Sequence, residues 1–271
     1  MYQNPRFELK QNSKILIRDK KSKAYLVSAV FVALVFVMSL LVSNLSGLNR
    51  YMSNYVSEYA DAYTEAMEIA EETQNFEAAA DRLIEAMEEV TEWPEVSTVA
   101  IILSVAITVM LQIVNAGYDG YCMMATRGEE VSVKDLFNGF NYTGRIFFIV
   151  LIRGILVAIG LVLFIVPGII MIYNYRMAIY VAFDHPDWGP IACLKESRYM
   201  MKGKKGEVFG LEISFFGWFM VSQAAASVTI PIVDIWIKPY MGFTMAQMYN
   251  KISGYVPQKD TETQESDRKE I

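Results

Sequence analysis

The chain has 271 residues, of which 54% are hydrophobic and 20% charged, and its net charge at pH 7 is −6. Soluble domains are usually about 45–50% apolar, and here the apolar residues form long blocks with the charge between them. This pattern excludes an ordinary soluble domain and predicts an integral membrane protein. The two cysteines and the single histidine form no CxxC pair and no cluster, so we expect no metal and no cofactor.

The first 45 residues predict a membrane anchor. Residues 1–23 are basic, and the block Ala24–Leu45 that follows has no charged side chain. A helix of about 20 apolar residues spans the hydrocarbon core of a bilayer. The block is longer than the ~7–15 apolar residues of a cleaved signal peptide. We therefore predict a first transmembrane helix over 24–45, with 1–23 as a basic N-terminus in the cytoplasm.

Residues 46–95 are polar and strongly acidic. Their apolar positions recur at three- and four-residue steps, which is typical of an amphipathic helix, and 73–75 reads as a break between two helices. We predict an acidic, helical, extracytoplasmic segment between the first and second spans. Such a segment either is a solvated hairpin that repels its neighbours or attracts a cationic ligand, such as a metal ion or a cationic peptide.

Residues 96–254 are predicted to form a membrane domain with transmembrane helices 2–6. Its apolar blocks are Val96–Tyr118, Ile146–Ile165, Ile169–Phe183, Val208–Val228 and Ile230–Ile252. The second and third of these blocks could be two spans joined by a hairpin or one long kinked span.

The distribution of charge decides between these two readings. The loop 184–207 is basic, and lysine and arginine prefer cytoplasmic loops. The loop 119–145 is also placed inside, so two spans must separate it from 184–207. The prediction is an all-α, polytopic bundle of about six transmembrane helices in the cell membrane. Both termini are then cytoplasmic, and 255–271 forms a polar, disordered tail.

Three stretches resemble a known family. They are LFIVPGIIMIYNYRMAIYVAFDHPD (163–187), ACLKESRYMMKGKKGEVFGLEISFFGWF (192–219) and KPYMGFTMAQMY (238–249). The first is similar to the family's Pro-Gly-Ile-Ile span, which is followed by a His-Pro-Asp loop. The second is similar to its Ser-x3-Met-x-Gly-x-Lys segment, which is followed by Ser-Phe and Gly-Trp. The third is similar to its span that contains Pro-Tyr. These motifs are those of the bacterial integral membrane proteins catalogued as domain of unknown function 975.

The resemblance covers roughly 120–255. A proline and a charge, in TIPIVDIWIKPY, replace the family's usual Gly-Ile-Gly before Pro-Tyr, and the acidic segment looks like an addition to this member. The resemblance implies a six-helix membrane protein of the bacterial cell envelope. It implies no activity.

Four charged residues lie within or near the apolar blocks: Arg153, Arg176, Glu212 and Asp234. A charge at the bilayer centre costs about 2.5–3.5 kcal/mol on insertion scales, so such residues usually face the bundle interior and pair. They predict a polar path or binding site within the membrane. Structural ion pairs, or side chains that reach the interface, are the simpler alternative.

Helix breaks are predicted at Pro167, Gly168, Pro231 and Pro239. Broken membrane helices expose backbone groups that hold ions or small ligands in many transporters. The alternative is that proline and glycine only end short membrane hairpins.

The segment 195–205 is basic and also contains aromatic and methionine side chains. We expect its charged residues to contact the anionic head groups of the inner leaflet, at about 1 kcal/mol per charge. Docking of a cytoplasmic protein partner, or plain positive-inside topology, would explain the same residues, which are Lys195, Arg198, Lys202, Lys204 and Lys205.

The sequence contains no HExxH, GxSxG or GxxxxGK[ST] motif and no nucleic-acid-binding module. We therefore expect no enzyme. The first hypothesis is a non-catalytic scaffold or accessory subunit of the cell envelope that contacts partners on both faces. The alternative is a small transporter or permease component with a polar intramembrane site. Six spans are few for a complete carrier, so the alternative implies a homo-oligomer.

Overall fold

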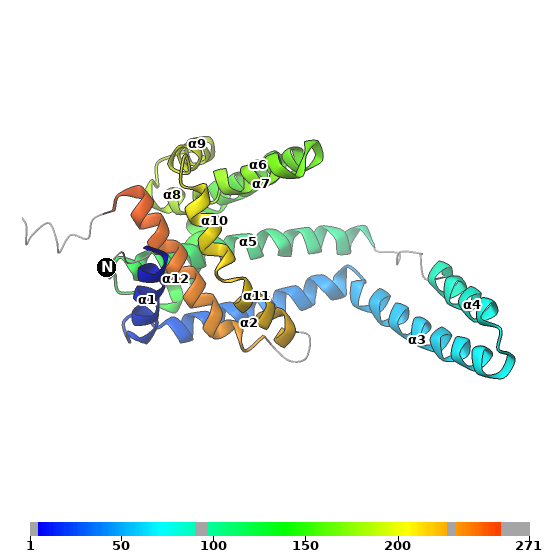
Figure 1. Ribbon diagram of the computed structural model, residues 1–271. Coiled ribbons are helices and arrows are strands. Elements are labelled where there is room, and N and C mark those ends of the chain that lie inside the picture. The colour runs from blue at the N-terminus through cyan, green and yellow to red at the C-terminus, as the bar shows by residue number, and fades with distance from the viewer. Residues whose placement is uncertain (1–4, 90–96, 227–230, 256–271) are drawn as a thin grey trace, which may run out of the picture. The chain divides into compact units, whose positions relative to one another are not determined.

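The computed structural model describes residues 5–89, 97–226 and 231–255. Every regular element in these ranges is a helix (Figure 1), which confirms the predicted all-α fold class. The residues divide into two compact units. We call 1–35 with 110–271 the core unit and 36–109 the hairpin unit. The predicted disordered tail lies outside the described residues, apart from Tyr255.

The hairpin unit contains α3 (Leu48–Thr73) and α4 (Phe76–Glu89), with the second part of α2 (Ala24–Leu45) and the first part of α5 (Thr98–Thr126). Gln74 ends α3 in the left-handed conformation, with φ 52°, inside the stretch where the sequence predicts a break. The two helices pack through small side chains, and Arg82 of α4 pairs with Glu65 of α3 at 2.6 Å. The buried residues of this interface are Ala62, Ala66, Ala79 and Ala86.

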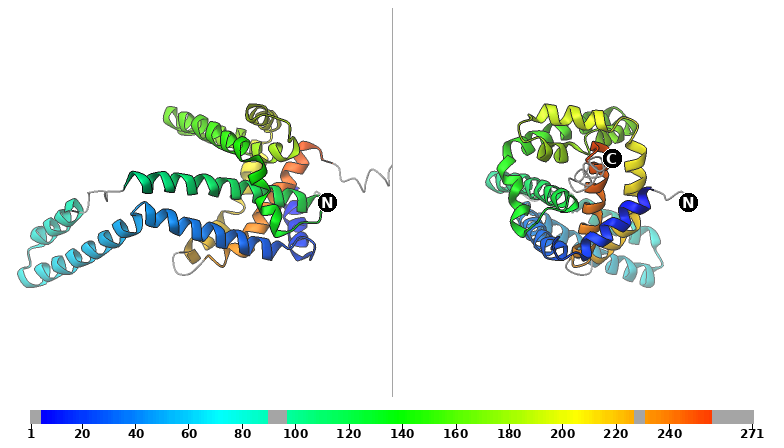
Figure 2. Two further views of the ribbon diagram at one scale, coloured as in Figure 1. Left: turned by 180° about the vertical axis from the view of Figure 1, so that it is seen from behind. Right: turned by 90° about the vertical axis from the view of Figure 1, so that its left-hand side faces the viewer.

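The core unit is built around one helix, α12 (Asp234–Ser253), which lies among its neighbours in Figure 2. Phe243, Thr244 and Tyr249 of α12 are fully buried. The core unit also contains the first part of α2 and the second part of α5. Its other elements are α1 (Pro5–Arg18), the 3₁₀-helix η1 (Val133–Tyr142), α6 (Thr143–Leu163), α7 (Ile165–Asn174), α8 (Ala178–Asp184), α9 (Pro190–Met200), α10 (Lys205–Ile213) and α11 (Phe216–Ala226).

The basic N-terminal segment forms a helix, α1, that packs against α12. Ser13 and Thr244 share a buried hydrogen bond of 2.9 Å, and Gln247 donates to Ser13 at 3.0 Å. The sequence predicts only a basic, cytoplasmic segment here. The packing of α1 against α12 was therefore not predicted from the sequence.

Four described helical stretches are long and apolar enough to cross a membrane. They are Ala24–Leu45, Thr98–Thr126, Val133–Leu163 and Ile165–Asp184. Helices α10 and α11 would make a fifth span if they form one span bent by 42°. Helix α12 does not meet the same criterion, and it carries Asp234, Lys238 and Lys251. The count of six spans therefore stays a prediction.

Residues 146–183 form separate helices, of which α6 and α7 lie side by side. The chain turns at Phe164, which is extended, with φ −162° and ψ 148°. The predicted turn at Pro167 and Gly168 is thus displaced: Pro167 lies in the first turn of α7, where proline fits because its missing N–H is not needed. Pro231 precedes α12, and Pro239 lies inside α12 without ending it.

Glycine allows the close approach of α6 and α7. A Cβ on Gly168 would lie 2.9 Å from the Cα of Leu161, and one on Gly160 would lie 3.0 Å from the Cα of Gly168. Since backbone atoms cannot move aside as a side chain can, Gly168 needs glycine, whereas a side chain at position 160 would require the neighbouring backbone to shift by a few tenths of an ångström.

We predict that Gly168→Ala lowers the free energy of unfolding by about 1–3 kcal/mol, the usual effect of overpacking. Gly154→Ala is the control, since a Cβ there meets nothing within 4 Å. That change should be neutral or slightly stabilising, because alanine favours a helix interior over glycine. Thermal unfolding in one detergent measures both, and equal stabilities would contradict the close packing.

Candidate functional site

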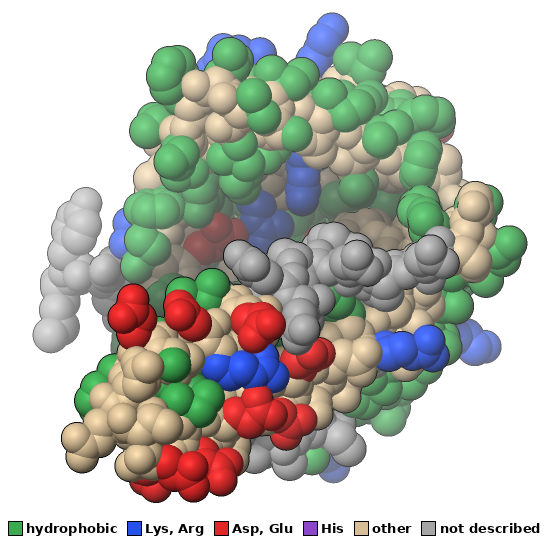
Figure 3. Space-filling model, turned by 90° about the vertical axis from the view of Figure 1, so that its right-hand side faces the viewer, with side chains coloured by type: hydrophobic (Ala, Val, Ile, Leu, Met, Phe, Trp, Pro, Cys, Tyr) green, Lys and Arg blue, Asp and Glu red, His purple; other side chains and the backbone are tan. Residues whose placement is uncertain are grey.

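A cavity of about 430 Å³ lies inside the core unit. Its walls come from α2, α5, α8, α10, α11 and α12 and from the turn before α8. Four charged side chains line it: Asp119, Arg176, Glu212 and Lys238. In Figure 3, basic and acidic side chains are visible in a recess behind the apolar outer surface. The cavity therefore combines charges of both signs with a largely apolar wall.

Arg176 and Glu212 form an ion pair on one side of this cavity. Arg176 lies in the turn between α7 and α8, and its Nε donates to Glu212 Oε1 at 2.8 Å. The hydroxyl of Tyr173 donates to Glu212 Oε2 at 2.8 Å. About a third of each charged side chain remains exposed, 32% for Arg176 and 29% for Glu212. Both carboxylate oxygens are thus held, while the pair keeps contact with the cavity.

Asp119 and Lys238 face the same cavity but are not ion-paired. Within the described residues, neither has an oppositely charged side chain within 4 Å. Tyr180 donates a hydrogen bond of 3.2 Å to Asp119 Oδ1. The ammonium of Lys238 lies 5.9 Å from the ring centre of Phe31, within range of a cation–π contact. One acid and one base therefore retain capacity for a further charged partner.

The structure brings only some of the predicted charged residues together. Arg153 does not line the cavity, although it lies close enough to feel the charges of Arg176 and Asp119. Asp234 is held elsewhere: it begins α12 and accepts a hydrogen bond from Ser222 of α11. Asp119 and Lys238 were not among the predicted site residues. The sequence signal for Asp119 is weak, because it directly follows an apolar block.

A second polar cluster joins the ends of three helices in the core unit. Arg127, just after α5, donates to both oxygens of Asp184 at the end of α8, at 2.5 and 3.0 Å. Tyr249 of α12 donates to Asp184 at 2.5 Å, and Arg127 also donates to Asn250 at 3.1 Å. Burial by itself would lower the pKa of Arg127, but the hydrogen bond and charge of Asp184 outweigh it and raise that pKa.

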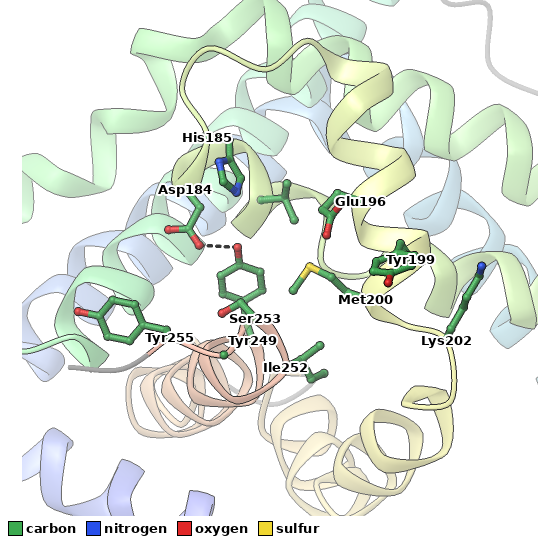
Figure 4. Close-up of a pocket in the computed structure, with 12 residues that line it drawn as sticks. Asp184, His185, Glu196, Tyr199, Met200, Lys202, Tyr249, Ile252, Ser253 and Tyr255 are labelled. Atoms are coloured by element: carbon green, nitrogen blue, oxygen red, sulfur yellow. Dashed lines mark hydrogen bonds between the residues drawn. The ribbon is translucent and has the colours of Figure 1, made fainter. Parts of the chain in front are cut away.

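A wider pocket of about 720 Å³ lies beside this second cluster. Figure 4 shows Asp184 and Tyr249 facing it, with Glu196, Tyr199 and Lys202 on the opposite wall. His185 lies in the loop before α9. The guanidinium of Arg145 donates hydrogen bonds to backbone carbonyls of this loop. The ring of His185 stacks on that of Trp188, with ring centres 3.9 Å apart. These contacts give His185 a structural role within the loop.

The basic residues expected at the inner leaflet lie on α9, on the turn after it and at the start of α10. Lys204 pairs with Glu207 at 3.0 Å, and Lys202 lies over the ring of Tyr199 at 5.5 Å. Contact of Lys195, Arg198, Lys202, Lys204 and Lys205 with lipid stays a prediction. Among the described residues, no group of three or more His, Cys, Asp or Glu side chains could hold a metal ion.

Comparison with known proteins gives one match. A family model described as "Protein of unknown function (DUF975)" matches residues 146–255. This range contains the three stretches that carry the resemblance, which is thereby confirmed. No curated protein and no solved structure matches the chain.

We predict that Asp184→Asn lowers the free energy of unfolding by about 3 kcal/mol, because it leaves a buried guanidinium without its counter-charge. Only 10% of Arg127 and 19% of Asp184 is exposed. The control is Lys251→Gln, which breaks an exposed pair of 3.5 Å with Glu207 and should change stability by less than about 0.5 kcal/mol. Unfolding in one detergent compares the two, and an equal effect would show that the buried pair adds nothing.

Proposed function

Residues 146–255 of this chain belong to the DUF975 family of proteins of unknown function, and we propose that the whole chain is a small transporter or permease component that binds a zwitterionic molecule. The observation that carries the proposal is the unpaired Asp119 and Lys238 in one cavity. The geometry thus favours the second of the two functions expected from the sequence.

The free-energy cost of unpaired charges favours a ligand that carries both a positive and a negative group. A charged side chain kept in an apolar surrounding is costly unless it finds a partner. A ligand ammonium would neutralise Asp119, and a ligand carboxylate would neutralise Lys238. The aromatic wall, which includes Phe215, Phe216 and Phe219, would receive an apolar side chain of the ligand. Amino acids and short peptides combine these three features, and a cavity of about 430 Å³ is in the range of small-molecule sites.

The proposal assumes a multi-pass protein of a bacterial cell membrane, with six transmembrane spans and both termini in the cytoplasm. Four or five helices support it by length and composition. The sixth span would be α12, whose Lys238 faces the cavity rather than lipid. We propose that the chain is not an enzyme, since its sequence contains none of the reaction motifs sought. A homo-oligomer would supply the further spans that a carrier needs.

The proposal predicts that at least one amino acid or dipeptide stabilises the protein and that Lys238→Gln and Asp119→Asn abolish this effect. A ligand present at 100 times its Kd adds about 2.7 kcal/mol to the stability of the folded state. The measurement is thermal unfolding of the full chain in detergent with the twenty amino acids and a set of dipeptides, tested one at a time.

Lys251→Gln is the matched control for this experiment, because it removes the same charge from the same helix outside the cavity. It should respond to the ligand as the wild type does. If no zwitterion stabilises the wild type, or if Lys238→Gln responds equally, the proposed function is wrong.

A scaffold or accessory subunit is the second candidate function, and the pocket beside α9 favours it. This pocket is wide, and its wall includes Tyr199, which is 67% exposed. Lys202 lines it, and the other basic residues of 195–205 belong to the same segment. Their positive charge would attract either an acidic protein segment or anionic lipid head groups. Purification from mild detergent separates the two candidates, since a scaffold should bring a reproducible protein partner with it.

A further inference from the structure

The hairpin unit exposes an apolar face. On α3, five large apolar side chains recur at steps of three and four residues and are between 40% and 60% exposed. They are Met52, Val56, Tyr59, Tyr63 and Met67. Residues with this spacing share one side of a helix. Since α4 packs against the neighbouring side of α3 through Ala62 and Ala66, the stripe is left open in the hairpin unit.

Helix α4 extends this apolar face. Phe76 is 75% exposed, Ile84 is 55% exposed, and Ala80 lies between them at steps of four residues. On each helix the stripe lies about 100° from the contact between α3 and α4, in the same rotational sense. Because the two helices run antiparallel, equal rotations bring both stripes to the same side of the hairpin. The face is therefore two helices wide.

The hairpin unit is strongly acidic. Helical spacing places Glu77 and Asp81 of α4 beside this face, whereas most acids of α3 lie on the side away from the stripe. Helices α3 and α4 together carry eleven Asp or Glu residues against Arg50 and Arg82. Figure 3 shows the red acidic side chains crowded over this unit, with green apolar groups between them. The arrangement decides which partner fits. A second copy would bring its own net negative charge close to that of the first, and an anionic lipid surface would repel the unit as well.

We propose that this face of α3 and α4 docks a cationic amphipathic helix of another protein or peptide. The partner's apolar side covers the stripe from Met52 to Met67, and its lysine and arginine side chains are attracted by the net negative charge of the hairpin unit and by the acids at the edge of α4. The stripe spans about 22 Å along the helix, which matches about fifteen residues of a partner helix. Helices that lie on membranes carry basic polar faces, whereas this one is acidic, so the partner and not the bilayer supplies the positive charge.

The interaction is tested with the full chain in nanodiscs of zwitterionic lipid. The probe is a fluorescent peptide of about eighteen residues, long enough for five helical turns, with leucine on one face and lysine on the other. Fluorescence anisotropy measures its binding, and empty nanodiscs give the background. We expect saturable binding, and a peptide of the same composition in scrambled order should bind at least about tenfold more weakly.

The variant Val56→Ser with Tyr63→Ser should weaken binding about tenfold or more, since it removes the centre of the apolar stripe. The matched control is Ser53→Ala with Ser57→Ala, which changes two exposed residues of α3 outside the stripe and should bind as the wild type does. Raising the salt concentration from 0.05 to 0.5 M should weaken binding at least severalfold, because exposed charges are screened.

Two results would overturn the proposal. One is binding no tighter than to empty nanodiscs, or binding that both double variants retain equally. The other is a dimer of the wild-type chain that the Val56→Ser and Tyr63→Ser variant converts to a monomer, since the occupant would then be a second copy. Neither result depends on the cavity of the core unit, so this proposal and the proposed function can fail separately.

Discussion

The ion pair between Arg127 and Asp184 fixes the ends of three helices in the core unit. Asp184 ends α8, Arg127 follows α5, and Tyr249 of α12 donates to the same carboxylate. The same three helices continue into the walls of the cavity, where they present Asp119, Tyr180 and Lys238. Tyr180 lies about one helical turn from Asp184, and Asp119 about two turns from Arg127. The position of the charged groups in the cavity therefore depends on this network.

Much of the helical framework can be predicted from the sequence because the signals are local. The uncharged block Ala24–Leu45 and the amphipathic spacing of the acidic segment each follow from neighbours along the chain. The docking of α1 cannot be predicted in this way. It rests on Ser13 meeting Thr244 and Gln247, which are more than two hundred residues away in sequence. The displaced turn at Phe164 shows the same limit, since proline is also accepted in the first turn of a helix.

The candidate site was predicted only in part. Arg176 and Glu212 are conspicuous because each interrupts an apolar block, and the structure places them in one ion pair. Asp119 and Lys238 lie near block ends or beside prolines, where charges are ordinary. What distinguishes them is that α5 and α12 bring them to one cavity without pairing them. That property is tertiary, so no spacing rule along the sequence could reveal it.

The cavity and the apolar face of the hairpin unit use charge in opposite ways. In the cavity, a few charges are withdrawn from water, so each has a strong preference for a partner and is little affected by salt. On α3 and α4, many acids remain in water, where each contributes little and their sum acts over about one Debye length, or about 8 Å at physiological ionic strength. The cavity is thus suited to selecting one small ligand by its geometry. The hairpin face is suited to attracting a partner by its net charge, while the apolar stripe decides which partner remains bound.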